Sequence, residues 1–548
     1  MFLHLIGPDQ EGGKPGLKAT WRRGKHNQTR TIGEADPANK FAPCPAAVIL
    51  PAAGDAAPFY PSPASCLRLS GPARLPAGAK ATQAPIMHQT RQFDTPGWGQ
   101  ELRATLALAM PLAATNLLQM LIHAVDVIFI ARLGDKPLAA SSLGIAIFGL
   151  TVWAMTGLVG ACAPLIAAER GRRLHSVREI RRTVRMGMWV AVLFGLVGMA
   201  IAFGGEAMLL ASGQTPEIAA LAGDFLAIIA WAMVPMVLAG VFRIFVAALG
   251  KPGYATAITL LALGTNALGN WALVFGNLGM PALGLTGSAV SSVITAFAML
   301  IAYVVVIGRD RTLRRYRIFG RWWRPEWSRL KQIMVIGTPI SLTVLAEAGL
   351  FSGAALLMGR FGETELAAHT LALNLAALAF QIPFGTAQAA TIRVGFHHGA
   401  GDRVAAGRAG WVALAIGTGF MSVTALAMVL VPEAMLWVYI DTDAPENAAL
   451  IAFALQYLVL AAIFQLADGV QAVGAGALRG LQDTRVPMWI AIFSYWVPGF
   501  GMAIWLGFYT PLEGTGVWIG LATGLFFAAA LLLWRWARRD RLGLTNDA

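Results

Sequence analysis

Three carboxylic acids lie inside long apolar stretches of this sequence, where a charge is costly to bury. Glu347 is the only ionisable residue between Ile333 and Met358, and Asp126 and Asp468 occupy two other apolar stretches. A carboxylate in hydrocarbon is strongly disfavoured, so each acid is expected to face other helices or water and to have a function there. The alternative is a protonated carboxyl that bonds to a neighbouring helix and only supports packing.

Amide and imidazole side chains accompany the first acid at helical spacing. Gln119 and His123 precede Asp126 by seven and three residues, which places all three on one face of a helix. Asn266 and Asn270 are four residues apart and also share a face. Their amide oxygens are suitable ligands for Na⁺, and the same amides are equally suited to hold the carboxyl group in place or to join helices. Taken alone, His123 fits a packed histidine better than a proton relay.

The second half of the chain carries its own polar side chains beside Glu347 and Asp468. Two glutamines lie one turn to either side of Asp468, and three further amides recur at seven-residue spacing in another apolar stretch; these are Gln465, Gln471, Asn374, Gln381 and Gln388. Together with Glu347 they are expected to line a cavity that is acidic, rich in amides and otherwise apolar. Such a cavity suits lipophilic cations, because apolar walls hold the body of the ligand while a carboxylate balances its charge.

The composition identifies a polytopic membrane protein. Of 548 residues, 57% are hydrophobic and only 13% are charged, which is too apolar for a soluble chain of this size. The net charge of +13 resides in short loops between apolar stretches, so it indicates membrane orientation rather than nucleic-acid binding. The sequence has no Gly-x-x-x-x-Gly-Lys-[Ser/Thr] phosphate loop and no nucleophile beside a base, so we expect no enzyme, no ATP-driven step and no cofactor other than a coupling ion.

Twelve apolar segments follow one another at regular spacing. The predicted spans are residues 104–131, 138–166, 187–211, 219–249, 254–275, 283–307, 333–359, 366–395, 409–431, 449–478, 487–510 and 515–534. Arginine is concentrated at 170–185, 309–331 and 535–541, whereas the opposite loops carry only Arg132, Lys136 and Arg360. Since basic loops stay in the cytoplasm, both termini are predicted to be cytoplasmic.

The chain also repeats itself. An offset of 228 residues aligns Pro111 with Pro339 and Arg132 with Arg360, and further matches extend over half the chain. This indicates duplication of a six-span unit, and therefore an all-α membrane protein with two pseudo-symmetric six-helix lobes.

The repeat predicts the domain boundaries. The N-lobe is expected at 100–308, a basic cytoplasmic linker at 309–332, the C-lobe at 333–536 and a cytoplasmic tail at 537–548. Residues 1–99 are predicted to be disordered or an over-extended N-terminus, with Met87 as an alternative start, because the first 86 residues are rich in Pro, Gly and Ala.

Three segments support a resemblance to a known family. PLAATNLLQMLIHAVDVIFIARLGDKPLAA, PISLTVLAEAGLFSGAALLMGRFGETELAAH and DGVQAVGAGALRGLQDTRVP resemble the multidrug and toxic compound extrusion (MATE) family, specifically its NorM-like bacterial branch. The resemblance covers about residues 100–536. It implies a bacterial inner-membrane antiporter that exports organic cations in exchange for Na⁺ or H⁺.

The same resemblance implies roles for individual residues. Asp126 is similar to the acid of the N-lobe ion site, with Asn266 and Asn270 as its partners, although some relatives carry an acid where this chain has Asn270. Glu347 and Asp468 are similar to the acids of the C-lobe cation site. Pro111 matches the proline at which the first span bends between states.

Two other functions stay open at this point. One is a flippase of lipid-linked intermediates, which should need a basic cavity, whereas the inward stripes are acidic and neutral. The other is a non-transporting subunit of a membrane complex. As a transporter, the chain is expected to be a monomer. It should bind small organic cations and contact membrane lipid, and it should not bind nucleic acid.

Overall fold

The computed structural model describes residues 96–172, 176–320, 323–441 and 444–545. Residues 1–95 of the predicted N-terminal extension, including Met87, lie outside the described residues. Among the described residues, twelve helical spans are long and apolar enough to cross a membrane. The predicted fold class is confirmed.

Six spans form the N-lobe. They are α1 (Trp98–Ala131), α2 (Asp135–Gly160) with α3 (Cys162–Arg172), α4 (Ser176–Phe203), α6 (Pro216–Ile229) with α7 (Met233–Ala248), α8 (Gly253–Phe275) and α9 (Leu285–Arg309). A short helix, α5 (Gly205–Ala211), follows α4. The core of this lobe includes Phe242 and Phe245 of α7 and Ile180 of α4, all buried. It extends to Ile333 and Ile392 in the other lobe.

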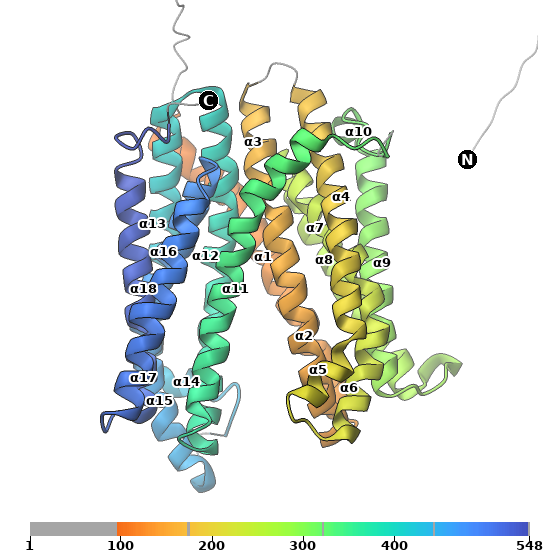
Figure 1. Cartoon of the computed structure of the whole chain (residues 1–548), viewed down its shortest axis with the longest axis vertical. Coiled ribbons are helices and arrows are strands. Elements are labelled where there is room, and N and C mark those ends of the chain that lie inside the picture. The colour runs from red at the N-terminus through yellow and green to blue at the C-terminus, as the bar shows by residue number, and fades with distance from the viewer. Residues whose placement is uncertain (1–95, 173–175, 321–322, 442–443, 546–548) are drawn as a thin grey trace, which may run out of the picture. The chain divides into compact units, whose positions relative to one another are not determined.

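Six further spans form the C-lobe. They are α11 (Trp327–Met358), α12 (Glu363–Ala400), α13 (Arg403–Leu430), α15 (Ala448–Gly480), α16 (Arg485–Ser494) continuing to α17 (Gly501–Phe508), and α18 (Glu513–Ala537). The short helix α14 (Pro432–Leu436) follows α13. A second core, built around Tyr457, Phe464 and Trp518, lies inside this lobe. Figure 1 shows α4 and α9 of one lobe on the opposite side of the molecule from α13 and α18 of the other.

The third span differs most from its predicted range. The apolar segment at 187–211 predicts a later helix, whereas α4 begins at Ser176, ends at Phe203 and is followed by a break at Gly204. The first turns of α4 carry Arg181, Arg182 and Arg185. Hydropathy marks only the part of a helix that is apolar, so a helix that continues into polar surroundings is longer than its apolar segment.

The twelfth helix ends on the side where the first begins, because the number of spans is even. We call this side of the molecule the terminal side. The chain between the lobes also lies there, as Figure 1 shows for α10 (Arg311–Arg314). Lys251 Nζ lies 2.5 Å from Asp310 Oδ2, which fixes the start of this connection to the N-lobe. The hydrogen bond from Lys251, with help from Thr312, holds the pKa of Asp310 well below its usual value.

Prolines mark two of the spans in different ways, since one contains a π-helical segment and the other stays α-helical throughout. Between α16 and α17 the chain forms a π-helical segment, Tyr495–Phe500, that contains Pro498. Pro111 lies inside α1, and its carbonyl oxygen accepts hydrogen bonds from Thr115 Oγ1 (2.7 Å) and from Thr256 Oγ1 of α8 (2.8 Å). A proline within a helix removes one backbone hydrogen bond and allows a bend at that point.

Candidate functional site

Asp126 of α1 faces α8 and α9, and only 7% of its surface is exposed. Its Oδ1 accepts hydrogen bonds from Asn266 Nδ2 (2.9 Å) and Asn270 Nδ2 (2.8 Å). Its Oδ2 accepts one from Ser292 Oγ at 3.2 Å. The structure therefore brings the predicted trio together and adds Ser292, which sequence reasoning missed because a single serine in an apolar span gives no spacing signal.

The two asparagines act on Asp126 as donors. Both amide nitrogens point at the carboxylate, while Asn270 Oδ1 is buried without a hydrogen-bond partner among the described residues. In the described arrangement the amides hold the carboxyl group in place and thereby also join α8 to α1. Since three donors occupy the oxygens of Asp126, a metal ion there would have to displace some of them.

Among the described residues neither Gln119 nor His123 is hydrogen-bonded to Asp126, although His123 is close enough for an electrostatic interaction with it. Gln119 Oε1 accepts a hydrogen bond of 2.9 Å from Arg243 Nη1 of α7. His123 is exposed. Arg243 is a second residue that the sequence analysis missed, although an arginine inside the apolar segment 219–249 is a signal of the same kind as a buried acid.

The C-lobe gathers a larger polar cluster from α11, α15 and the π-helical segment. Glu347 is close enough to Asp468 for repulsion between their charges, and close enough to Arg479 for attraction. Gln471 Nε2 donates a hydrogen bond of 2.7 Å to Tyr495 Oη, which also feels the charges of both acids. We call Glu347, Asp468, Gln471, Arg479 and Tyr495 the C-lobe cluster.

Several oxygens in and beside the C-lobe cluster lack partners. Asp468 Oδ1, Gln471 Oε1 and Ser494 Oγ are buried and have no hydrogen bond within the described residues. An unsatisfied buried polar group costs about 1–3 kcal/mol, so such groups call for a partner. A cavity of about 10 Å³ is bordered by Gln471 and Arg479 of this cluster. Oxygens of carboxylate, amide and hydroxyl groups are the ligands that hard cations prefer, and a proton would also satisfy the carboxylate.

The other predicted cavity residues are placed differently from one another. Gln465 is fully buried inside the C-lobe, where it contacts Met428 and Thr424. Gln381 Nε2 donates to the carbonyl oxygen of Ala377 on its own helix. Gln388 reaches Asn116 of α1 across the lobes at 3.4 Å. Asn374 is exposed. The predicted stripe on α12 therefore does not form one connected polar surface.

The lobes meet along a seam lined by glycines, in the half of the molecule toward the terminal side. A Cβ on Gly399 of α12 would lie 2.0 Å from the carbonyl oxygen of Ala168 on α3, and one on Gly171 would lie 2.0 Å from that of Phe396. A Cβ on Gly337 of α11 would lie 2.3 Å from the carbonyl oxygen of Leu158. Only glycine permits such an approach between backbones, so the lobes are closely packed here.

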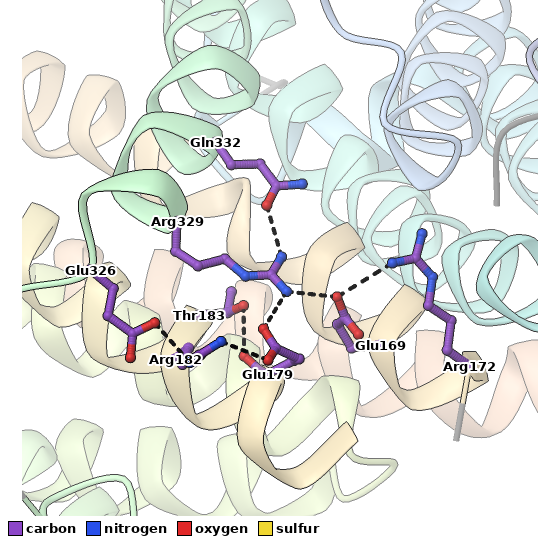
Figure 2. A network of polar contacts seen from close by, with 8 residues as sticks. All are labelled: Glu169, Arg172, Glu179, Arg182, Thr183, Glu326, Arg329 and Gln332. Carbon is purple, nitrogen blue, oxygen red and sulfur yellow. Dashed lines mark hydrogen bonds and ion pairs between the residues drawn. The ribbon is translucent and has the colours of Figure 1, made fainter. Parts of the chain in front are cut away.

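Ion pairs close the same side (Figure 2). Arg329 Nη2 lies 2.8 Å from Glu169 Oε1 and 2.7 Å from Glu179 Oε2, and Arg182 joins Glu179 to Glu326. These contacts tie the beginning of α11 to α3 and α4. We call them the terminal-side network.

A second set of charges joins α1 to α12. Arg393 Nε donates to Glu101 Oε1 at 2.7 Å, and His397 Nε2 lies 3.3 Å from Glu101 Oε2. Glu101 is completely buried. Removing one partner of a buried ion pair leaves an uncompensated charge, so loss of Arg393 would strongly destabilise the packed arrangement of the lobes.

The seam makes a prediction about Gly399. In Gly399→Leu the side chain would push α12 away from α3, and overpacking of this kind costs roughly 1–3 kcal/mol, or about 5- to 150-fold in an equilibrium constant. We expect the closed seam to be populated less and ethidium efflux from cells to fall accordingly. The measurement is accessibility of a cysteine at Ala168 to a thiol reagent, alongside efflux.

A matched substitution controls for the added bulk. Gly419 of α13 has open space around its Cβ position, so Gly419→Leu should leave both accessibility and efflux unchanged. Equal behaviour of the two variants would show that the seam does not depend on close backbone approach.

A protein-family model matches two separate parts of the chain. The family model MatE matches residues 111–272 and 339–505. The two matches begin 228 residues apart, at Pro111 and Pro339, which is the offset of the internal repeat. The duplication predicted from the sequence therefore coincides with two copies of one family unit.

Relatives match nearly their whole length. The chain is 45% identical to the probable multidrug resistance protein NorM of Mesorhizobium japonicum over 81% of this chain and 95% of that protein. It is 41% identical to the protein of the same name from Brucella suis, over 80% and 94% respectively. The fold is similar to that of the eukaryotic MATE transporter AtDTX14, with a TM-score of 0.74 at 18% identity over 82% of this chain and all of that chain.

Proposed function

This chain belongs to the MatE family, and from that premise we propose that it is a multidrug efflux antiporter that exports lipophilic organic cations in exchange for Na⁺ or H⁺. It would work in the bacterial inner membrane with both termini in the cytoplasm, so that the terminal side is the cytoplasmic side. The related proteins named multidrug resistance protein support the export of drugs. The basic loops on the terminal side support the orientation.

The observation that carries the proposal is the C-lobe cluster. Two acids, Glu347 and Asp468, lie near each other inside apolar surroundings, and Asp468 Oδ1 and Gln471 Oε1 have no described partner. We propose that a coupling ion takes these oxygens when the site faces outward, and that a cationic drug displaces it when the site faces inward. A ligand shifts such an equilibrium only through its difference in affinity between the two states.

We assign a supporting part to Asp126 and its donors Asn266, Asn270 and Ser292, which we call the N-lobe set. Asp126 already has three donors, so a proton or ion would have to compete with Asn266, Asn270 and Ser292. Protonation of Asp126 would weaken the hydrogen bonds from these donors and loosen the contact of α1 with α8 and α9. Because Pro111 lies fifteen residues earlier on α1, we propose that this loosening allows α1 to bend there.

The seam supplies the conformational half of the cycle. With the terminal side packed shut by Gly399, Gly171 and the terminal-side network, the described arrangement corresponds to a state closed to the cytoplasm. Export then requires that these contacts break. Moving one charge inward down ~100 mV supplies ~2.3 kcal/mol, enough for a roughly fiftyfold concentration ratio of drug.

The second candidate function is a flippase of lipid-linked intermediates. Arg243 and Arg479 favour it, because they add positive charge to polar clusters that the sequence analysis took as acidic and neutral. However, Arg479 lies beside Glu347, which balances its charge.

Efflux from membrane vesicles distinguishes these functions. Ethidium transport is measured in proteoliposomes under an imposed Na⁺ gradient and, separately, under an imposed pH gradient. The proposal expects transport that follows one gradient and stops when it collapses. Ethidium movement that is independent of both gradients, together with reorientation of a fluorescent lipid-linked pyrophosphate, would favour the flippase. A non-transporting subunit would give neither signal.

A further inference from the structure

A second polar site lies outside the lobes' inward-facing clusters, on the terminal side. A pocket of about 500 Å³ opens between the first turns of α4 and the connection that follows α10. Its lining includes six arginines, Arg178, Arg181, Arg182, Arg185, Arg317 and Arg324, and we call it the arginine pocket. Arg182 and Glu326 of the lining also belong to the terminal-side network, as Figure 2 shows.

The charge of the arginine pocket is strongly unbalanced. Among its described lining residues only Glu326 is acidic, and this carboxylate already pairs with Arg182 at 2.8 Å. Within the described chain, Arg178, Arg181, Arg317 and Arg324 have no acidic partner within ion-pair distance. Like charges held this close repel one another, so an anion that bound among them would relieve the repulsion.

The wall of the pocket is fixed rather than loose. Arg185 Nε donates to the carbonyl oxygen of Ile318 at 3.1 Å, and its Nη2 donates to that of Arg317 at 3.1 Å. Arg317 itself has φ of 46°, a left-handed conformation that non-glycine residues rarely adopt. These bonds hold the connection against α4 and keep the arginines gathered, which spares a ligand the cost of assembling them.

We propose that the arginine pocket binds a phosphate group. The guanidinium group presents a planar fork of donors that matches phosphate oxygens, and several such groups around one pocket favour a multiply charged anion over chloride. The phosphate has two possible sources, the headgroup of an anionic phospholipid and soluble phosphate.

The surroundings favour the lipid. Trp323 and Trp327, beside the pocket in the chain, are 60% and 71% exposed. Tryptophan on the surface of a membrane protein typically marks the level of the lipid headgroups. Basic pockets at the cytoplasmic ends of membrane helices are suited to such headgroups, and the proposed orientation places this one there.

The test measures binding by the full-length protein through its unfolding temperature, since a ligand of the folded state raises it. One arm adds phosphatidylglycerol to protein in phosphatidylcholine nanodiscs, and the other adds inorganic phosphate to protein in an uncharged detergent at constant ionic strength. The variant is Arg178→Gln with Arg324→Gln, two exposed residues of the pocket. The matched control is Arg311→Gln with Arg314→Gln, two exposed arginines of α10 outside the lining.

The wild type is expected to gain stability with phosphatidylglycerol, and the pocket variant to bind roughly thirtyfold more weakly, for two arginines at about 1 kcal/mol each near the membrane surface. The control should bind like the wild type. A response to inorganic phosphate as well would identify phosphate itself as the ligand. The proposal is overturned if neither probe stabilises the wild type, if the pocket variant binds as the wild type does, or if the control is weakened as much.

Discussion

Replacing Glu347 by Gln is expected to abolish ethidium efflux while leaving the amount of folded protein in the membrane unchanged. The substitution keeps the shape of the side chain and removes its charge, so neither ion nor cationic drug would find its counter-charge in the C-lobe cluster. It also leaves Arg479 without the acid that attracts it. Asp468→Asn should have the same effect, because the two acids act on each other. Efflux is followed in cells by ethidium fluorescence, and folding by size-exclusion chromatography of a fluorescent fusion.

An exposed glutamate provides the control for Glu347→Gln. Glu363 lies in the first turn of α12 on the surface, so Glu363→Gln makes the same chemical change away from the C-lobe cluster and should transport normally. Normal efflux by both Glu347→Gln and Asp468→Asn would show that the cluster is structural.

Asp126→Asn is expected to abolish efflux as well, by a different route. The new amide would turn a donor toward Asn266 or Asn270, whose own amide nitrogens already point there, and would remove the titratable group. Ser292→Ala removes only one of the three donors to Asp126, and the loss of one such hydrogen bond, about 1 kcal/mol, corresponds to roughly fivefold weaker coupling. The measurement is the initial rate of ethidium efflux against the size of the imposed ion gradient.

The expected difference between Asp126→Asn, which should abolish efflux, and Ser292→Ala, which should only weaken it, makes this test specific. Ser142→Ala changes an exposed serine in the same lobe and should have no effect. If Ser292→Ala abolished transport while Asp126→Asn kept it, the donors rather than the acid would carry the function of the N-lobe set.

Most of the fold was predictable, because hydropathy identifies membrane spans and matching residues at a constant offset identify the duplication. Pro111 and Pro339 set the offset, and the family model begins at the same two positions. The start of α4 at Ser176 was not predictable in this way, since its first turns are rich in arginine and do not look apolar. Segments with Gly204 or Pro498 change helical geometry locally, which hydropathy does not register.

The site was predictable only in part. Spacing along a helix correctly grouped Asn266 with Asn270, but which neighbour they face depends on how α1, α8 and α9 pack. Partners from distant parts of the chain were missed for the same reason, among them Ser292 beside Asp126 and Tyr495 beside Gln471. Arg479 was missed because an arginine at the end of an apolar stretch resembles an ordinary cytoplasmic flank.

The central claim is that ion and drug occupy the buried carboxylates of the C-lobe cluster in turn. The direct measurement is the Kd of ethidium for the purified protein, titrated with Na⁺ at constant ionic strength and, separately, with pH. We predict that the Kd of the wild type rises with Na⁺ or with proton concentration, and that this dependence disappears in Asp468→Asn. A wild-type Kd that stays constant in both titrations, while transport remains coupled to a gradient, would contradict competition at this site.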